Sequence, residues 1–137
     1  MVAICVRSLG QTPVECNARS LLFKAHAALE RAAFVECGCL LREAVRIWLD
    51  AECRYHDCLP KTKKPAPPRV LAKALVKAGE LDKDMHEWVV EVIEMGNQAA
   101  HLVFVRPSLL ECGISMTLSM LDGSPYLIQP KAAGRLS

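Results

Sequence analysis

The clearest helical pattern in the chain lies in residues 84–101, which read DMHEWVVEVIEMGNQAAH. Its apolar or small positions recur every three or four residues, at Met85, Trp88, Val89, Val92, Ile93 and Gly96. That spacing is typical of an amphipathic α-helix with one face against a core. Asp84 and Glu87 have the spacing of a capping box, so we predict that this helix begins near Asp82 or Asp84.

Four other segments show the same apolar spacing. Asn17 is a suitable N-cap for the first of them, Gly38 separates the first two, and Gly79 ends the short third one. Four prolines between positions 60 and 68 exclude helix from the loop at 56–68. We predict these further helices at residues 17–33, 39–55, 68–78 and 107–121.

The predicted fold class is all-α, with four main helices and a shorter one. Residues 1–16 lack a helical period and Pro13 interrupts them, so we expect an N-terminal extended arm there. The helical domain is expected at 17–121, followed by a C-terminal tail at 122–137. The chain has 137 residues, of which 52% are hydrophobic and only 5% aromatic. One domain with an aliphatic core is therefore expected.

The charge, the hydropathy and the cysteine count of the chain bear on its expected partners and location. The formal net charge is +2, and no uninterrupted apolar run approaches the ~20 residues of a membrane span. The first residues carry no basic stretch before a long apolar one, so no secretion signal is expected. The cysteine count is seven, an odd number. Without a secretion signal, this indicates mostly reduced thiols in a cytoplasmic protein.

Cysteine and histidine are the usual ligands of structural zinc, so their spacing matters. Cys53 and Cys58 have four residues between them, and His56 lies in that interval. Cys37 and Cys39 are too close together for the usual zinc knuckle. We expect free, mostly buried thiols, no metal and no cofactor. A zinc-stabilised module at Cys53, His56 and Cys58 is the alternative.

The polar end of the segment at 84–101 holds the best candidates for chemistry. If the helix continues to its end, Glu94, Asn97 or Gln98, and His101 share one face. A carboxylate, an amide and an imidazole on one face can bind a polar ligand or transfer a proton. The alternative is a helix C-terminus in which Asn97 caps and His101 interacts with the last carbonyls.

The run Gly-Asn-Gln-Ala-Ala-His at 96–101, after two adjoining amphipathic helices and a short one, resembles the HEPN-like helical domains. It is most similar to an uncharacterised branch that occurs alone or fused to restriction-type nucleases and helicases. The resemblance covers roughly 18–121 and is supported by Leu-Leu-Arg-Glu-Ala-Val at 40–45. It implies an up-and-down helical bundle that often pairs as a homodimer. In ribonuclease members an arginine precedes the histidine by four to six intervening residues, and both meet their dimer mates in a cleft that cuts RNA without metal. The resemblance maps that histidine onto His101 and the polar residue of the motif onto Asn97.

The chain departs from that ribonuclease motif at the arginine. Positions 94–96 hold Glu, Met and Gly, and the nearest upstream arginine is Arg69. A carboxylate at Glu94 would repel a scissile phosphate that needs a guanidinium. We therefore predict a non-catalytic or degraded HEPN-like binding module, acting in defence or nucleic-acid metabolism. The alternative is a metal-independent ribonuclease that uses His101 at a dimer cleft, with Arg106 or a partner's arginine.

Basic residues concentrate in one part of the chain. Between Leu59 and Gly79 there are six basic residues and no acidic one, which leaves about −4 on the rest of the chain. The six are Lys61, Lys63, Lys64, Arg69, Lys73 and Lys77. They are candidates for contact with nucleic-acid phosphates, although lysines in a solvated loop are the alternative. The partners expected are a second copy of the chain, nucleic acid or another protein, and no membrane.

Overall fold

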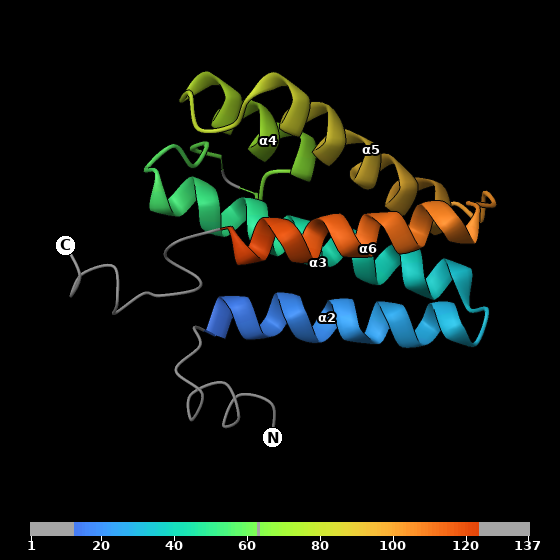
Figure 1. Ribbon diagram of the computed structural model, residues 1–137. Coiled ribbons are helices and arrows are strands. Elements are labelled where there is room, and N and C mark those ends of the chain that lie inside the picture. The colour runs from blue at the N-terminus through green and yellow to red at the C-terminus, as the bar shows by residue number, and fades with distance from the viewer. Residues whose placement is uncertain (1–12, 63, 124–137) are drawn as a thin grey trace.

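The computed structural model describes residues 13–62 and 64–123, with side chains from residue 17 onward. In this part of the chain every regular element is a helix, which confirms the predicted all-α bundle of four main helices and a shorter one (Figure 1). The elements are α2 (Pro13–Glu30), α3 (Phe34–Tyr55), α4 (Pro68–Lys77), α5 (Lys83–Ala100) and α6 (Pro107–Asp122).

The bundle is organised around α3, which contacts each of the other four helices in the described ranges (Figure 1). Further contacts join α2 to α6 and α4 to α5. The core is aliphatic, as the low aromatic content predicts. Its largest fully buried side chains are Leu22, Leu41, Leu49, Leu71, Leu75, Ile93, Leu110 and Leu121, with Val45, Val89 and Val92.

The N-terminal helix begins earlier than predicted. It starts at Pro13 rather than Asn17, because proline has the backbone angle of a first helical turn and lacks only an N–H that would be unpaired there. Four residues of the predicted arm are therefore helical. The helix also ends early, at Glu30, before Ala32 turns the chain with a φ of 61°. The rest of the arm at 1–12 and the tail at 124–137 lie outside the described residues.

The prediction of a break at Gly38 is wrong. Gly38 lies inside α3, which begins at Phe34, and it is buried where α3 crosses α5. A Cβ at Gly38 would lie 2.3 Å from the Cβ of Ala99, and a Cβ at Gly96 would lie 2.4 Å from that of Arg42. Both glycines thus allow a close approach of two helices, a role that sequence alone does not distinguish from a turn.

The start of α5 is capped by Asp82. Its Oδ1 accepts a hydrogen bond of 2.8 Å from the backbone N–H of Met85. Asp84 lies in the first turn, so the capping box predicted for Asp84 and Glu87 is wrong, while the predicted starting region is right. The cap is Asp82 because its backbone is still extended, as an N-cap requires.

The helix connections gather at two ends of the bundle. The α2–α3 turn and the α5–α6 connection meet at one end, and the α3–α4 loop and α4–α5 turn lie toward the other (Figure 1). Among the described residues no helix combines the length and the apolar character needed to cross a membrane.

Candidate functional site

Gly96 and Asn97 of α5 both contact Arg42 of α3. Asn97 Oδ1 accepts a hydrogen bond of 3.1 Å from Arg42 Nη1, and the bond is partly buried. Gly96 has no side chain where the Cβ of Arg42 passes over it. Gly96 and Asn97, in the segment predicted to bind a ligand, are therefore in contact with α3. The guanidinium of Arg42 lies beside Asn97.

The other predicted residues of this segment are spread over different surroundings. Glu94 forms an ion pair with Arg69, which ties α5 to α4. Gln98 is exposed and shares a shallow depression of about 200 Å³ with Glu94. His101 is the exposed C-cap of α5, and its backbone N–H donates to the carbonyl of Asn97 over 3.1 Å. Asn97 thus faces α3, while Glu94 and Gln98 line one depression.

The predicted basic residues occupy the α3–α4 loop and one face of α4. Lys61 and Lys64 are exposed in the loop, and Lys63 lies outside the described residues. Arg69, Lys73 and Lys77 are four residues apart and follow one stripe of α4. Lys73 and Lys77 line a shallow groove of about 310 Å³ with Cys58 and Val70. Arg106 lies apart from them, as the exposed N-cap residue of α6.

Two of the thiols of α3, Cys37 and Cys53, are buried in the protein, and Cys39 is half-buried. Burial first, and the Glu36 carboxylate second, raise the pKa of Cys37 to about 11. Burial and the neighbouring Cys58 raise the pKa of Cys53 to about 12, and its Sγ lies 3.4 Å from the carbonyl oxygen of Leu71. A thiol that stays protonated is a poor metal ligand. In the part of the chain that the structure describes, no three histidine, cysteine or acidic side chains are arranged to hold a metal.

An apolar surface covers the end of the bundle where the α2–α3 turn meets the α5–α6 connection. We name it the end surface. It surrounds a hollow of about 630 Å³ whose apolar lining is Ala32, Ala33, Phe34, Val35, Ala99, Leu102, Val103, Phe104 and Val105, with one charged residue, Glu36. Leu102 is 78% exposed and Phe104 is 68% exposed. The rings of Phe34 and Phe104 meet edge to face with centroids 6.1 Å apart. Contiguous apolar surface of this kind is uncommon on isolated domains.

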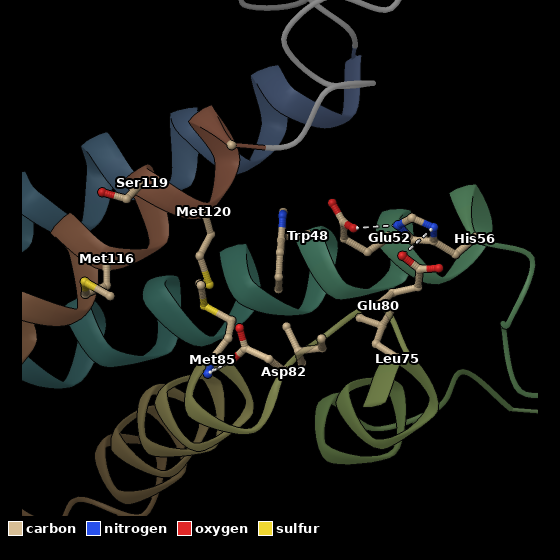
Figure 2. Close-up of a pocket in the computed structure, with 12 residues that line it drawn as sticks. Trp48, Glu52, His56, Leu75, Glu80, Asp82, Met85, Met116, Ser119 and Met120 are labelled. Carbon is tan, nitrogen blue, oxygen red and sulfur yellow. Dashed lines mark hydrogen bonds and ion pairs between the residues drawn. The ribbon is translucent and has the colours of Figure 1, made fainter. Parts of the chain in front are cut away.

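A second hollow lies between α3, the α4–α5 turn and α6, and we name it the acidic cavity (Figure 2). Its volume is about 380 Å³. His56 Nε2 lies 3.3 Å from Glu52 Oε1, and His56 Nδ1 lies 3.4 Å from Glu80 Oε1. Beside this triad stand Trp48, Leu75, Leu81, Asp82, Met85, Met116, Ser119, Met120 and Gly123.

Sequence reasoning missed the triad of the acidic cavity. The spacing of Glu52 and His56 places them one turn apart on α3, which was a usable signal. Glu80 comes from the α4–α5 turn, and nothing in its sequence position indicates which helix end it meets. The alternative prediction of a zinc site grouped His56 with Cys53 and Cys58. In the structure the His56 ring lies between the carboxylates of Glu52 and Glu80.

Comparison with protein-family models, with curated proteins and with solved structures finds no match for this chain.

Proposed function

We propose that this chain is a small binding module that pairs with a second copy of itself through the end surface. The observation that carries the proposal is the exposure of large apolar side chains on two connections that lie together, chiefly Leu102 and Phe104. Burying such side chains against a partner contributes roughly 25 cal/mol per Å² of apolar area. A HEPN-like character of the module, with a role in defence or nucleic-acid metabolism, is part of the proposal and rests on the sequence resemblance.

The charges beside the end surface favour a second copy as the occupant. Glu36 lines the hollow and forms an ion pair of 2.6 Å with Arg31, and both side chains are about half exposed. A two-fold interface places the same patch on both sides, so any charge on that patch must meet an opposite charge of the same patch. The end surface meets that requirement, because Arg31 of one copy can face Glu36 of the other.

The test is the mass of the particle in solution. Phe104→Glu places a charge within the end surface and should convert a dimer into a monomer, as measured by light scattering during size-exclusion chromatography. Phe23→Glu is the matched control, because Phe23 is 64% exposed on α2 and does not line the end surface. A monomeric wild-type chain, or equal dissociation by both variants, would refute the proposal.

A metal-independent ribonuclease is the second candidate, favoured by the position of Arg42. Arg42 of α3 donates a hydrogen bond to Asn97, which lies one helical turn before His101. In this candidate function, Arg42 takes the place of the arginine missing from positions 94–96. Pairing through the end surface would also bring two His101 residues toward the interface, because His101 adjoins Leu102. A guanidinium and an imidazole are the groups that cleavage without metal requires.

This candidate predicts RNA cleavage in the presence of a metal chelator. His101→Ala should abolish the cleavage, and Arg42→Lys should reduce it because lysine loses the planar, forked donor set. His86→Ala is the control, since His86 lies on the same helix away from the motif. Intact RNA with a dimeric wild-type chain would eliminate the ribonuclease and leave the binding module.

A further inference from the structure

The C-terminus of α3 brings two cysteines together. The helix ends at Tyr55, and Asp57 then turns the chain with a φ of 54°, in the left-handed region. The backbone N–H of Cys58 donates to the carbonyl of Cys53 over 2.8 Å, and that of Asp57 donates to the carbonyl of Arg54 over 3.2 Å. These two hydrogen bonds form a Schellman motif, in which the third helical residue from the end contacts the third residue after the helix. Here those two residues are Cys53 and Cys58.

The backbone and the side chains of Cys53 and Cys58 both suit a disulfide. With 2.8 Å between the Cys58 nitrogen and the Cys53 oxygen, standard bond lengths keep the two Cα atoms within about 6.7 Å of each other. Disulfides join residues whose Cα atoms lie about 4.4–6.8 Å apart. A side-chain hydrogen bond joins the two thiols, and it contributes to the raised pKa of Cys53 after burial and the charge of Cys58. Both cysteines are free thiols in this structure.

The two thiols differ in their access to solvent. Cys53 is 0% exposed, and its Sγ lies 3.4 Å from the carbonyl oxygen of Leu71. Cys58 is partly exposed and lines the shallow groove of about 310 Å³ beside α4. A small reagent therefore reaches Cys58 first, and Cys53 reacts with a sulfur that is already attached to Cys58. Access is one of the factors that decide which thiol attacks a disulfide.

We propose that Cys53 and Cys58 form a reversible disulfide by exchange with a small disulfide of the oxidised glutathione type. The Cys58 thiolate attacks one sulfur of the reagent, which forms a mixed disulfide and releases one thiolate. Cys53 then loses its proton and attacks the Cys58 sulfur, which forms the intramolecular bond and expels the second thiolate. The protons of the two cysteines end on the two released thiols, and two electrons reduce the reagent. The exchange does not depend on pairing of the chain.

The test treats the whole chain with oxidised glutathione and maps its tryptic peptides by mass spectrometry. Trypsin cleaves after Arg54, so Cys53 lies in the peptide 47–54 and Cys58 in the peptide 55–61, and neither peptide holds another cysteine. Oxidation should join the two peptides, and a reductant should separate them again. A glutathione adduct on the peptide 55–61 should precede the joined form, because the buried thiol reacts second.

Three variants assign the roles of the two thiols. Cys53→Ala removes the second thiol and should raise the final level of the glutathione adduct on Cys58 at least about tenfold. Cys58→Ser should leave the peptide 47–54 unmodified, because the reagent does not reach the buried thiol directly. Cys112→Ala is the control, since it removes an exposed thiol of α6 and should leave the joined peptide unchanged. Circular dichroism checks that each variant keeps its helices, and Cys53→Ser replaces Cys53→Ala if that variant does not.

The same exchange in urea separates the effect of the fold from closeness in sequence. The folded chain should be half oxidised at a ratio of oxidised to reduced glutathione at least about tenfold lower than the unfolded chain, because the fold holds the two sulfurs together. Equal ratios in the two states would overturn the proposal. So would a wild-type chain that keeps glutathione on Cys58 without joining the peptides, or one in which Cys53 pairs with a cysteine other than Cys58.

Discussion

Gly96 and Asn97 accommodate the same neighbour, Arg42 of α3. The absence of a side chain at Gly96 lets Arg42 cross α5, and the amide of Asn97 then accepts its hydrogen bond. Ala99 faces Gly38 in the same crossing. Three positions of the run at 96–101 are thus determined by helix packing, whereas Gln98, Ala100 and His101 are exposed and packing does not explain them.

Gly96→Ala tests this packing. The new Cβ would lie 2.4 Å from the Cβ of Arg42, a backbone-proximal atom that cannot move away by rotation. We expect a loss of about 1–3 kcal/mol in the free energy of unfolding, measured by urea denaturation. Gly123→Ala is the matched control: its nearest contact would be an ordinary 3.5 Å, and it should be neutral or slightly stabilising. A neutral Gly96→Ala would contradict the close crossing.

The buried thiol of Cys37 should make the folded chain less stable at high pH. Its pKa is about 11 in the folded chain because of burial and Glu36, against an ordinary value of 9.0. Between these two values the unfolded chain has lost a proton that the folded chain keeps. The thiol therefore has no effect on stability below about pH 9 and reduces it by up to about 1.4 kcal/mol per pH unit between about pH 9 and pH 11.

Urea unfolding at pH 8 and pH 10 measures this effect. The wild-type chain should be less stable at pH 10, and Cys37→Ala should show a smaller loss between the two conditions. Cys112→Ala is the control, because Cys112 is exposed and should leave the loss unchanged. Cys53, whose pKa is raised to about 12, supplies a second contribution of the same sign. An identical pH dependence in all three proteins would contradict the burial of Cys37.

At the scale of helices, periodicity predicted each element, and the errors lie at their ends. Apolar spacing locates α5 and α6 because their buried stripes are continuous. Gly38 misled the prediction because glycine serves both turns and close helix crossings, and only the partner helix distinguishes the two roles. Pro13 misled it because proline suits a first turn as well as a break.

The cap of α5 allows a direct comparison of two neighbouring acids. Asp82→Ala removes the acceptor for the Met85 N–H and should lower the free energy of unfolding by about 1 kcal/mol. Asp84→Ala removes only a favourable charge in the first turn, which contributes about 0.3–1 kcal/mol at an exposed position. Thermal and urea denaturation should rank Asp82→Ala as the more damaging change. The reverse order would assign the cap to Asp84.

At the scale of the molecule, α4 and the loop before it carry positive charge on an otherwise acidic body. The sequence predicts this division directly, since it depends on composition alone. The acidic cavity could not be predicted in the same way. It forms only where the end of α3, the α4–α5 turn and α6 meet, and those contacts join positions far apart in the chain. The end surface is likewise a product of two connections that fold together.

The positive segment predicts salt-dependent binding to RNA. Each lysine that contacts a phosphate of single-stranded RNA adds about 0.7 to the slope of log affinity against log salt. Replacing Lys64 and Lys73 together by glutamine should therefore lower that slope by about 1.4. The matched control replaces Lys24 and Lys83, which are also exposed but lie outside the segment. Equal slopes for both double variants would contradict a phosphate-binding role of the segment.

The central position of α3 has a consequence for hydrogen exchange. Among the described helices, each of the others packs against α3, whereas α4 makes its main contacts with α3 and α5. The buried amides in the middle of α3, around Val45 and Leu49, can exchange only when the whole bundle opens, so their exchange reports the global free energy of unfolding. Amides of α4 should exchange through smaller, local openings. A core substitution that lowers the global free energy of unfolding will then accelerate amide exchange in α3 in full proportion to that loss. Amide exchange in α4 will change less.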